Sequence, residues 1–316
     1  MAATIKLGVS TCLLGEKVRF DGGHKHNRYI TQVLGQFFDF IPVCPESECG
    51  LGIPRETMRL VGDANNPRLI TNKNHIDHTD KMLSWSAKRL SSLEKEDLCG
   101  FIFKKDSPSS GLHRVKVYND KGQPVKNGRG LFAAEFTKRF PRIPVEEEGR
   151  LNDPALRENF IERVFAMKRW REALHRRRTM GNLVDFHTRE KLLIMAHSQE
   201  RYREMGRLVA TGKQLKTADI YMRYEALLFR ALDLKGTVSK HTNVLMHILG
   251  YFKKQLSADE KKEVLELIQS YRSGYLPLIV PVTLMNHFVR KYRQPYLSLQ
   301  TYLNPHPIDL QLRNHV

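Results

Sequence analysis

No part of the 316-residue sequence is a long apolar run, so no segment is expected to span a membrane. A membrane-spanning helix needs about 18 or more apolar residues in succession. The best candidate, YLPLIVPVTLM, is short and interrupted by Pro277 and Pro281. The opening residues MAATIKLGVSTC predict a strand, without the longer apolar core and cleavage site of a secretory signal. We therefore expect a cytoplasmic protein with no membrane partner.

Cysteine is scarce, and its positions matter more than its number. The four cysteines are Cys12, Cys44, Cys49 and Cys99. In a cytoplasmic protein they are expected to be reduced thiols or metal ligands rather than disulfides. The histidines form no recognisable metal signature, and two or three cysteines without a partner histidine make a poor zinc site.

Acidic residues are outnumbered, which favours a polyanionic partner. The chain has 52 Lys and Arg against 34 Asp and Glu, for a net charge of +18. Residues 1–150 contain 24 basic and 18 acidic residues, whereas residues 151–316 contain 28 and 16. Such an excess is typical of nucleic-acid binding first and of an acidic membrane second. The second half is expected to contribute most of the positive field.

Short β-branched runs alternate with helical stretches in the first half of the chain. The strand candidates are TIKLGVST, FFDFIPVC, PRLIT, CGFIFKK, HRVKVY and the end of RFPRIPVEEEGR, with helices over TDKMLSWSAKRLSSLEKED and RGLFAAEFTKRF. Strand–helix alternation favours a parallel sheet with helices on its faces. We predict an α/β domain over residues 1–150, with a Rossmann-like parallel sheet covered by helices on both faces.

From NDPALRENFIERVF onward the sequence predicts helices almost throughout. Pro154 sits early in the first of these, and apolar residues recur at helical spacing behind it. The stretch VDFHTREKLLIMAHSQERYREMGRLVA is expected to be one of the later helices. Residues 151–316 are therefore expected to form a second, all-α domain with a basic surface.

Three strand ends in the first half carry polar or sulfur-bearing residues. Cys12 ends the first strand, Cys44 ends the second, and the loop SPSSG follows the strand GFIFKK. The carboxyl ends of parallel strands lie at one edge of a sheet, where ligands bind. Cys99 begins its strand and is expected at the opposite edge. The loops at the ligand edge also contain Glu46, Arg19, Asp21 and Ser109, the last three as substrate-loop candidates. Metal-assisted hydrolytic chemistry and a helix-capping glutamate beside two packed cysteines are both compatible with this pattern.

Several motifs in order resemble the thiouracil and thiouridine desulfidase family. They are VSTCLLG, RFDGG, PVCPE, GLGIPRE and DSPSSGLHRVKVY, spanning roughly residues 5–148. From EEEGRL onward the chain resembles the YbgA-like helical domain often fused to this desulfidase. The fused form is similar to bacterial desulfidases that remove 4-thiouridine from tRNA.

The resemblance implies a [4Fe–4S] cluster held by three cysteines, with the fourth iron open to the thiocarbonyl sulfur of the substrate. It implies that Cys12 and Cys44 are ligands, that Glu46 is the acid/base and that Ser107 binds substrate or water. Sulfur would be replaced by water-derived oxygen without net redox change. Thiolates are the ligands that such clusters prefer.

The chain departs from the family pattern at the third ligand. Members read SPSCG where this chain reads SPSSG, so Ser110 stands at the position of the third cysteine. Three explanations are open. The serine is an introduced substitution, or it is a natural variation that weakens or loses the cluster. In the third, Cys49 or Cys99 serves as the third ligand. We expect the chain as written to bind a cluster poorly and to be nearly inactive.

The basic segment KRWREALHRRR is the first candidate for RNA contact, as a helix with one aromatic residue. Its candidate residues are Lys168, Arg169, Trp170, Arg171, Arg176, Arg177 and Arg178. Further candidates are Lys191, Arg201, Arg203, Lys253, Lys254, Arg290, Lys291 and Arg293. The partner is expected to be tRNA, and no protein partner is predicted. The alternatives are a desulfidase of free thiolated pyrimidines or nucleotides, and an inactive RNA-binding protein with a decayed cluster site.

Overall fold

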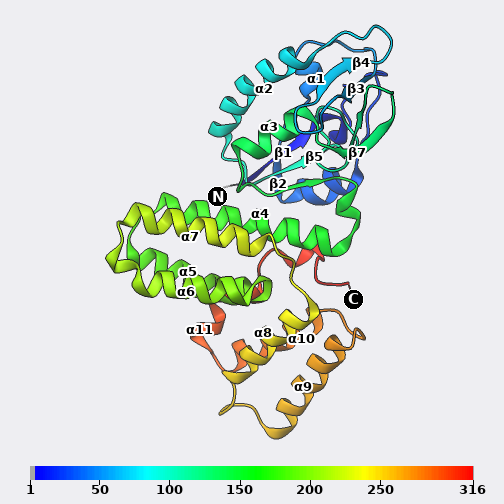
Figure 1. Cartoon of the computed structure of the whole chain (residues 1–316). Helices are drawn as coiled ribbons and strands as arrows, with labels where there is room; N and C mark the ends of the chain where they lie inside the picture. Colours follow the sequence, from blue (N-terminus) through cyan, green and yellow to red (C-terminus); the bar gives the residue numbers. More distant parts are fainter. Residues whose placement is uncertain (1–3, 316) are drawn as a thin grey trace. The chain divides into compact units, whose positions relative to one another are not determined.

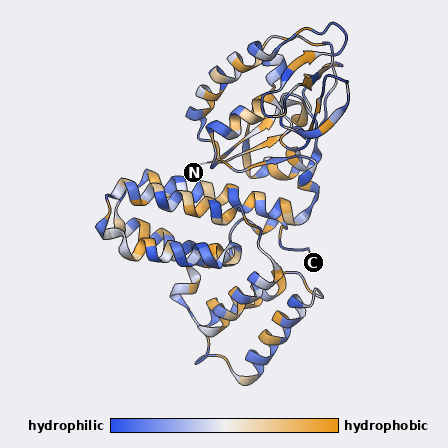
Figure 2. Ribbon diagram, in the orientation of Figure 1, coloured by the Kyte–Doolittle hydropathy of each residue, from blue (hydrophilic) through white to orange (hydrophobic). Residues whose placement is uncertain are grey.

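The structure is a computed structural model that describes residues 4–315. The chain divides into two compact units, Met1–Asp153 and Pro154–Val316 (Figure 1). Strands occur only in the first unit, and within the described residues the second unit contains helices and turns alone. In both units the helices carry hydrophilic and hydrophobic residues together (Figure 2), as expected for elements with one buried face.

The first unit is built on a four-stranded parallel sheet in the order β2-β1-β5-β8. Its strands are β1 (Ile5–Ser10), β2 (Phe38–Val43), β5 (Gly100–Phe103) and β8 (Val145–Glu147). Leu7 is aligned with Phe40 on one side and with Gly100 on the other. Every residue of β5 is buried, which is typical of a parallel strand covered on both faces.

Two helices pack together beside this sheet, α2 (Thr79–Leu93) and α3 (Leu131–Arg139). Trp85 of α2 and Phe132 of α3 have ring centroids 5.4 Å apart, and Phe136 of α3 lies 4.8 Å from Phe101 of β5. The short helical turn Leu34–Gln36, between β1 and β2, contacts β2. The predicted α/β class, a parallel sheet covered by helices, is confirmed.

A second, mixed sheet in the order β4-β3-β6-β7 corrects the expectation of a single parallel sheet. Its strands are β3 (Met58–Val61), β4 (Arg68–Thr71), β6 (Val115–Tyr118) and β7 (Pro124–Gly128). PRLIT and HRVKVY are strands, but both belong to this sheet. Only six residues separate β3 from β4, and only five separate β6 from β7, so each pair folds as an antiparallel hairpin.

The second unit is helical, as predicted. Its main helices are α4 (Pro154–His175), α5 (Met180–His197), α6 (Gln199–Thr211), α7 (Thr217–Leu232), α8 (Val238–Gly250), α9 (Ala258–Arg272) and α10 (Ile279–Lys291), followed by the short α11 (Pro295–Ser298). The expected single helix over 184–210 is wrong. The chain breaks at Ser198, whose hydroxyl accepts a hydrogen bond from the Arg201 N–H and caps α6. No helix within residues 4–315 has both the length and the apolar character needed to cross a membrane.

A buried polar network around Arg313 links the C-terminal segment to the helices of this unit. Arg313 is 3% exposed and donates to Glu162 of α4 at 2.7 Å and to the Tyr302 carbonyl at 2.7 Å. His197 pairs with the other Glu162 oxygen at 3.0 Å. These charges are out of water but mutually compensated, which a buried ion pair requires. The C-terminal segment is therefore part of the core of this unit.

Candidate active site

A cavity of about 310 Å³ lies at the carboxyl end of β1, β2 and β5. It is lined by residues 10–12, 18–20, 25, 43–46, 55 and 104–110. Because β1 lies between β2 and β5, the segments that follow these three strands are neighbours in space. The sequence-based expectation that Cys12, Cys44 and the serine loop meet at one sheet edge agrees with this arrangement.

Two cysteine thiols face this cavity from separate strands. Cys12 lies in a short 3-10 helix directly after β1, and Cys44 precedes α1 (Pro45–Glu48) after β2. Burial, and after it the nearby Cys44, raise the pKa of the Cys12 thiol to about 11. Burial also raises the pKa of Cys44. The two sulfurs thus share a partly desolvated wall, where a bound cation would favour their thiolate forms.

The serine loop is organised around the Ser107 hydroxyl. Its oxygen accepts hydrogen bonds from the backbone N–H groups of Ser109 (3.3 Å) and Ser110 (3.1 Å). The Ser107 and Ser109 hydroxyl oxygens are 3.0 Å apart. Both hydroxyls donate to Glu46 Oε1, at 2.8 Å from Ser109 and at 3.4 Å from Ser107. Ser109 and Ser110 are buried. The loop therefore presents two hydroxyls to the same carboxylate oxygen.

The start of α3 holds this loop in place. The Pro108 and Ser109 carbonyls accept hydrogen bonds from Leu131 N–H (3.2 Å) and Phe132 N–H (3.0 Å). A Cβ at Gly130 would lie 2.5 Å from the carbonyl carbon of Ser109, so only glycine allows this approach. The position of Ser110 is consequently set by backbone contacts on a rigid helix end.

Glu46 forms an ion pair with Arg55, which is not among the site residues predicted from the sequence. Both Nε and Nη2 of Arg55 donate to Glu46 Oε2, the Nε bond measuring 3.0 Å. Arg55 also donates to the carbonyls of Val18 (3.0 Å) and Gly52 (3.1 Å), and its side chain is only 6% exposed. The signal was available, because Arg55 lies within the motif GLGIPRE. Arginine and the serine pair hold opposite oxygens of one carboxylate.

Positive side chains predominate around the rest of the cavity. Arg19, Lys25, Lys104 and Lys105 line it together with the acidic Asp106, and Lys104 is ion-paired with Glu148. The predicted substrate-loop residues Arg19 and Ser109 are part of the lining. Asp21 is not among the lining residues. It is exposed and lies 3.5 Å from Arg19 Nε, and the Gly23 N–H lowers the pKa of its carboxyl.

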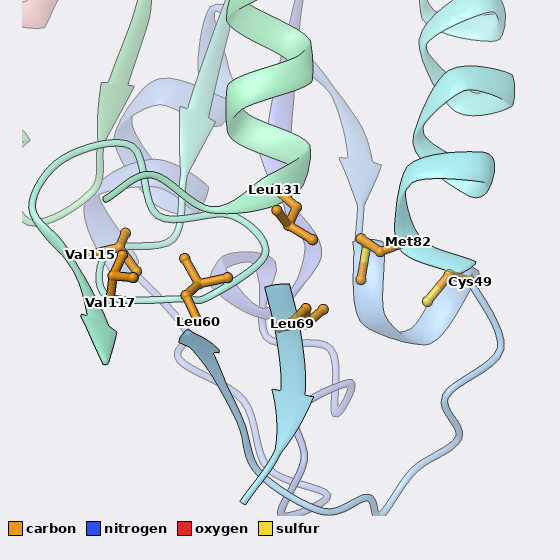
Figure 3. Packing of buried hydrophobic residues seen from close by; sticks show 7 residues of the cluster. All are labelled: Cys49, Leu60, Leu69, Met82, Val115, Val117 and Leu131. Atoms are coloured by element: carbon orange, nitrogen blue, oxygen red, sulfur yellow. The ribbon is translucent and has the colours of Figure 1, made fainter. Parts of the chain in front are cut away.

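The other two cysteines lie outside the cavity lining. Cys49 packs with Met82 in the hydrophobic cluster of the second sheet (Figure 3), and its thiol contacts the Glu46 carbonyl at 3.4 Å. Cys99 comes directly before β5, at the strand end opposite the serine loop, and is buried. The structure therefore disfavours both as substitutes for the third ligand.

The donor atoms do not fit a cluster held by three cysteines. The cavity offers the Cys12 and Cys44 thiols, and at the third position it offers the Ser110 hydroxyl. Within residues 4–315 no group of three or more His, Cys, Asp or Glu side chains is arranged to hold a metal ion. Serine is a harder and far less acidic donor than cysteine, so it is a poor replacement toward iron and sulfide. The cavity therefore offers two thiolates where a cluster held by three cysteines needs three.

Trp170 is not available for stacking on a base, which corrects one of the RNA-contact expectations. It is 1% exposed and stacks on Tyr224, with ring centroids 5.4 Å apart, inside the helical unit. Helical periodicity directs it into the core, as it does for an apolar residue. Arg169 is also engaged, donating to the buried Glu190 at 2.6 Å and to the Pro305 carbonyl at 3.0 Å.

The remaining basic residues of this segment differ in environment. Lys168 lies 3.6 Å from Glu172 on the same helix, and Arg171 is half-buried. Because α4 ends at His175, the expected basic helix stops before the three arginines. Arg176, Arg177 and Arg178 form an exposed connection to α5. Of the predicted segment, these three are the most accessible to a polyanion.

Comparisons with known proteins identify both parts of the chain. Residues 7–148 match the family described as 2-thiouracil desulfurase, and residues 191–307 match a family described as a protein of unknown function, DUF1722. The uncharacterized protein YbgA of Escherichia coli is 35% identical over 153 residues, covering 48% of this chain and 90% of YbgA.

Among solved structures, the [4Fe–4S]-dependent thiouracil desulfidase TudS is similar to part of the chain. The match is 25% identical, with a TM-score of 0.39, and covers 48% of this chain and 95% of TudS. The family matches confirm the resemblance noted from the motifs, including the fusion of the two domains. The chain therefore belongs to the YbgA family through its helical part, joined to an N-terminal part that matches the 2-thiouracil desulfurase family.

Proposed function

We propose that this protein is a tRNA 4-thiouridine desulfidase, an enzyme that converts 4-thiouridine in tRNA to uridine. In the overall reaction water supplies the oxygen of the new carbonyl, and the thiocarbonyl sulfur leaves as sulfide, with no oxidation or reduction of the base. One observation carries the proposal: the Cys12 and Cys44 thiols, the third-ligand position Ser110 and the carboxylate Glu46 surround one cavity in a 2-thiouracil desulfurase domain.

The carboxylate of Glu46 is the group best placed to move protons in this cavity. Its Oε1 accepts a hydrogen bond from Ser109 at 2.8 Å, while Arg55 occupies Oε2. A carboxylate fixed in this way can take a proton from an attacking water and return it to the departing sulfur. Ser107 and Ser109 can exchange their bond to Glu46 for one to substrate or water, since hydroxyls both donate and accept.

A phosphate-bearing substrate suits this cavity better than a free base. Arg19, Lys25, Lys104 and Lys105 lie on its wall, and such side chains recognise phosphate oxygens. The helical unit adds a further excess of positive charge, with 28 basic against 16 acidic residues over 151–316. A free thiolated pyrimidine has no negative backbone to use this surface. These charges support tRNA as the substrate over free thiolated bases.

The test is conversion of 4-thiouridine by the Ser110→Cys protein after anaerobic iron and sulfide reconstitution. Nucleosides from treated tRNA should show 4-thiouridine replaced by uridine in equal amount. Free 2-thiouracil at the same concentration should react far more slowly. Preference for the free base would favour the small-molecule alternative. Binding of tRNA by a reconstituted protein that leaves 4-thiouridine intact would favour an RNA-binding protein with a decayed site, the reading that Ser110 supports.

The exposed arginines between α4 and α5 provide a separate test of the tRNA partner. Replacing Arg176, Arg177 and Arg178 by glutamine should weaken tRNA binding and reduce the slope of log affinity against log salt by about 2, since each lost phosphate contact removes about 0.7–0.9. Fluorescence anisotropy at several salt concentrations measures both quantities. Lys262→Gln, which neutralises an exposed lysine on α9, is the matched control. An unchanged affinity and slope would exclude these arginines from the interface.

A further inference from the structure

Two tyrosines, one exposed and one half-buried, stack at the surface of the helical unit. Tyr251 directly follows α8 and Tyr296 lies in α11, two elements that lie beside one another (Figure 1). Their ring centroids are 5.0 Å apart with planes inclined by 22°, and Tyr251 is 38% exposed. His247, exposed one turn earlier on α8, meets Tyr251 edge-on at 5.6 Å. Gln294 joins the two elements through hydrogen bonds to the Tyr251 carbonyl and Gln255.

Cations accompany these rings. The Lys191 ammonium on α5 lies 4.6 Å from the centroid of the Tyr296 ring, within the range of a cation–π interaction. Lys253 and Lys254, two and three residues after Tyr251, are exposed, and no carboxylate within residues 4–315 pairs with either. The aromatic stack therefore has positive side chains near it, and no ion pair among the described residues of the unit neutralises Lys253 or Lys254.

The segments that carry the stack contain no acidic residue. Residues 234–258, which include α8 and Tyr251, have no Asp or Glu, and neither have residues 267–308, which include α10 and α11. The chain has 34 acidic residues in all, yet these two segments contribute only neutral or positive side chains, and Glu260 of α9 pairs with Lys291 of α10. A protein surface of acidic or mixed charge would gain little from the ring faces. A polyanion with planar groups can bind both the aromatic rings and the cations.

We propose that Tyr251, Tyr296, His247 and Lys191, here called the tyrosine platform, bind unpaired nucleotides of RNA. A base stacks on the exposed face of Tyr251, and the phosphates on either side contact Lys253 and Lys254. Aromatic stacking with nearby cations is the general way in which single strands are bound without sequence preference. The inference rests on the proposed tRNA substrate, and it assigns base stacking to Tyr251, 81 residues after the buried Trp170.

The experiment measures binding of a fluorescein-labelled single-stranded oligouridylate of about 12 nucleotides to the full chain. The Tyr251→Ala/Tyr296→Ala protein should bind it at least about tenfold more weakly. Tyr251→Phe/Tyr296→Phe, which keeps both rings, should stay within about twofold. Tyr251→Ala alone should lose about fivefold, and it guards against a folding defect because this ring is the more exposed.

Salt dependence separates the two kinds of contact. Lys253→Gln/Lys254→Gln should reduce the slope of log affinity against log salt by about 1.4, whereas the alanine variants should keep the slope of the original chain. Folded alanine variants with full affinity would overturn the proposal, and so would an equal loss in the phenylalanine pair. If the alanine pair abolished self-association in sedimentation without changing RNA affinity, the surface would join copies of this chain, which also overturns it.

Failure of the platform and failure of the proposed function are distinguishable. If the Ser110→Cys protein desulfurises tRNA while oligouridylate binding ignores Tyr251 and Tyr296, only the platform is wrong. If the platform binds single strands as described but 4-thiouridine stays intact, only the desulfidase reaction is wrong.

Discussion

Replacing Ser110 by cysteine should raise the iron content after anaerobic reconstitution from below about one atom to about four atoms per chain. The serine loop is already held by the start of α3, with Gly130 packed against Ser109, so a cysteine at 110 inherits a fixed position beside Cys12 and Cys44. Three thiolates then replace two thiolates and a hydroxyl, which is a softer donor set that suits iron and sulfide. Iron and sulfide analysis and the broad visible absorbance of the cluster measure the gain.

Position within the loop is the control for this result. Ser109→Cys adds a thiol one residue away and should leave the iron content low, because the Ser109 side chain points at Glu46. Cys12→Ser in the Ser110→Cys background should abolish the gain. Equal loading of the Ser109→Cys and Ser110→Cys proteins, or full loading of the original chain, would contradict the assignment of position 110.

In the reconstituted Ser110→Cys protein, Glu46→Gln should lower kcat by about 10²–10⁴-fold, with a much smaller change in KM. The amide keeps the shape of the side chain but cannot accept a proton from water. In the structure the Arg55 guanidinium donates to Glu46 Oε2. In the variant it faces the neutral amide group of the glutamine instead of a carboxylate. Single-turnover conversion of 4-thiouridine, together with iron content, separates the loss of chemistry from any loss of the cluster.

Glu16→Gln is the matched control, because Glu16 is an exposed carboxyl in the same unit and outside the cavity lining. It should change turnover by less than about twofold, as expected for a surface substitution. If Glu46→Gln turned over within about threefold of its parent, the acid/base role of Glu46 would be excluded.

The location of the site could be predicted from the sequence because parallel strands direct their carboxyl ends to one edge. Cys12, Cys44 and the serine loop each follow a short apolar run, and that placement alone brings them to a common cavity. Cys99 was separated from them by the same reasoning, since it precedes its strand. The roles of these residues came from the motifs, and the departure at Ser110 is visible only by comparison with them.

Other features depend on contacts that periodicity does not encode. Arg55 reaches Glu46 across a loop, so nothing in local spacing indicates the pair. The second sheet arises because PRLIT and HRVKVY sit in tight hairpins, whose partners β3 and β7 are weak strand candidates. Trp170 has the basic neighbours of an RNA contact, but its own helical face is buried. The Tyr251–Tyr296 pair joins residues 45 positions apart, and only the fold brings them together.

The most direct test of the central claim is to follow the oxygen atom. The reconstituted Ser110→Cys protein is incubated with 4-thiouridine-containing tRNA in ¹⁸O-labelled water, and the nucleosides are analysed by mass spectrometry. The account predicts that each uridine formed from 4-thiouridine carries one ¹⁸O and that sulfide is released in equal amount. Intact 4-thiouridine, or uridine without the label, would contradict it.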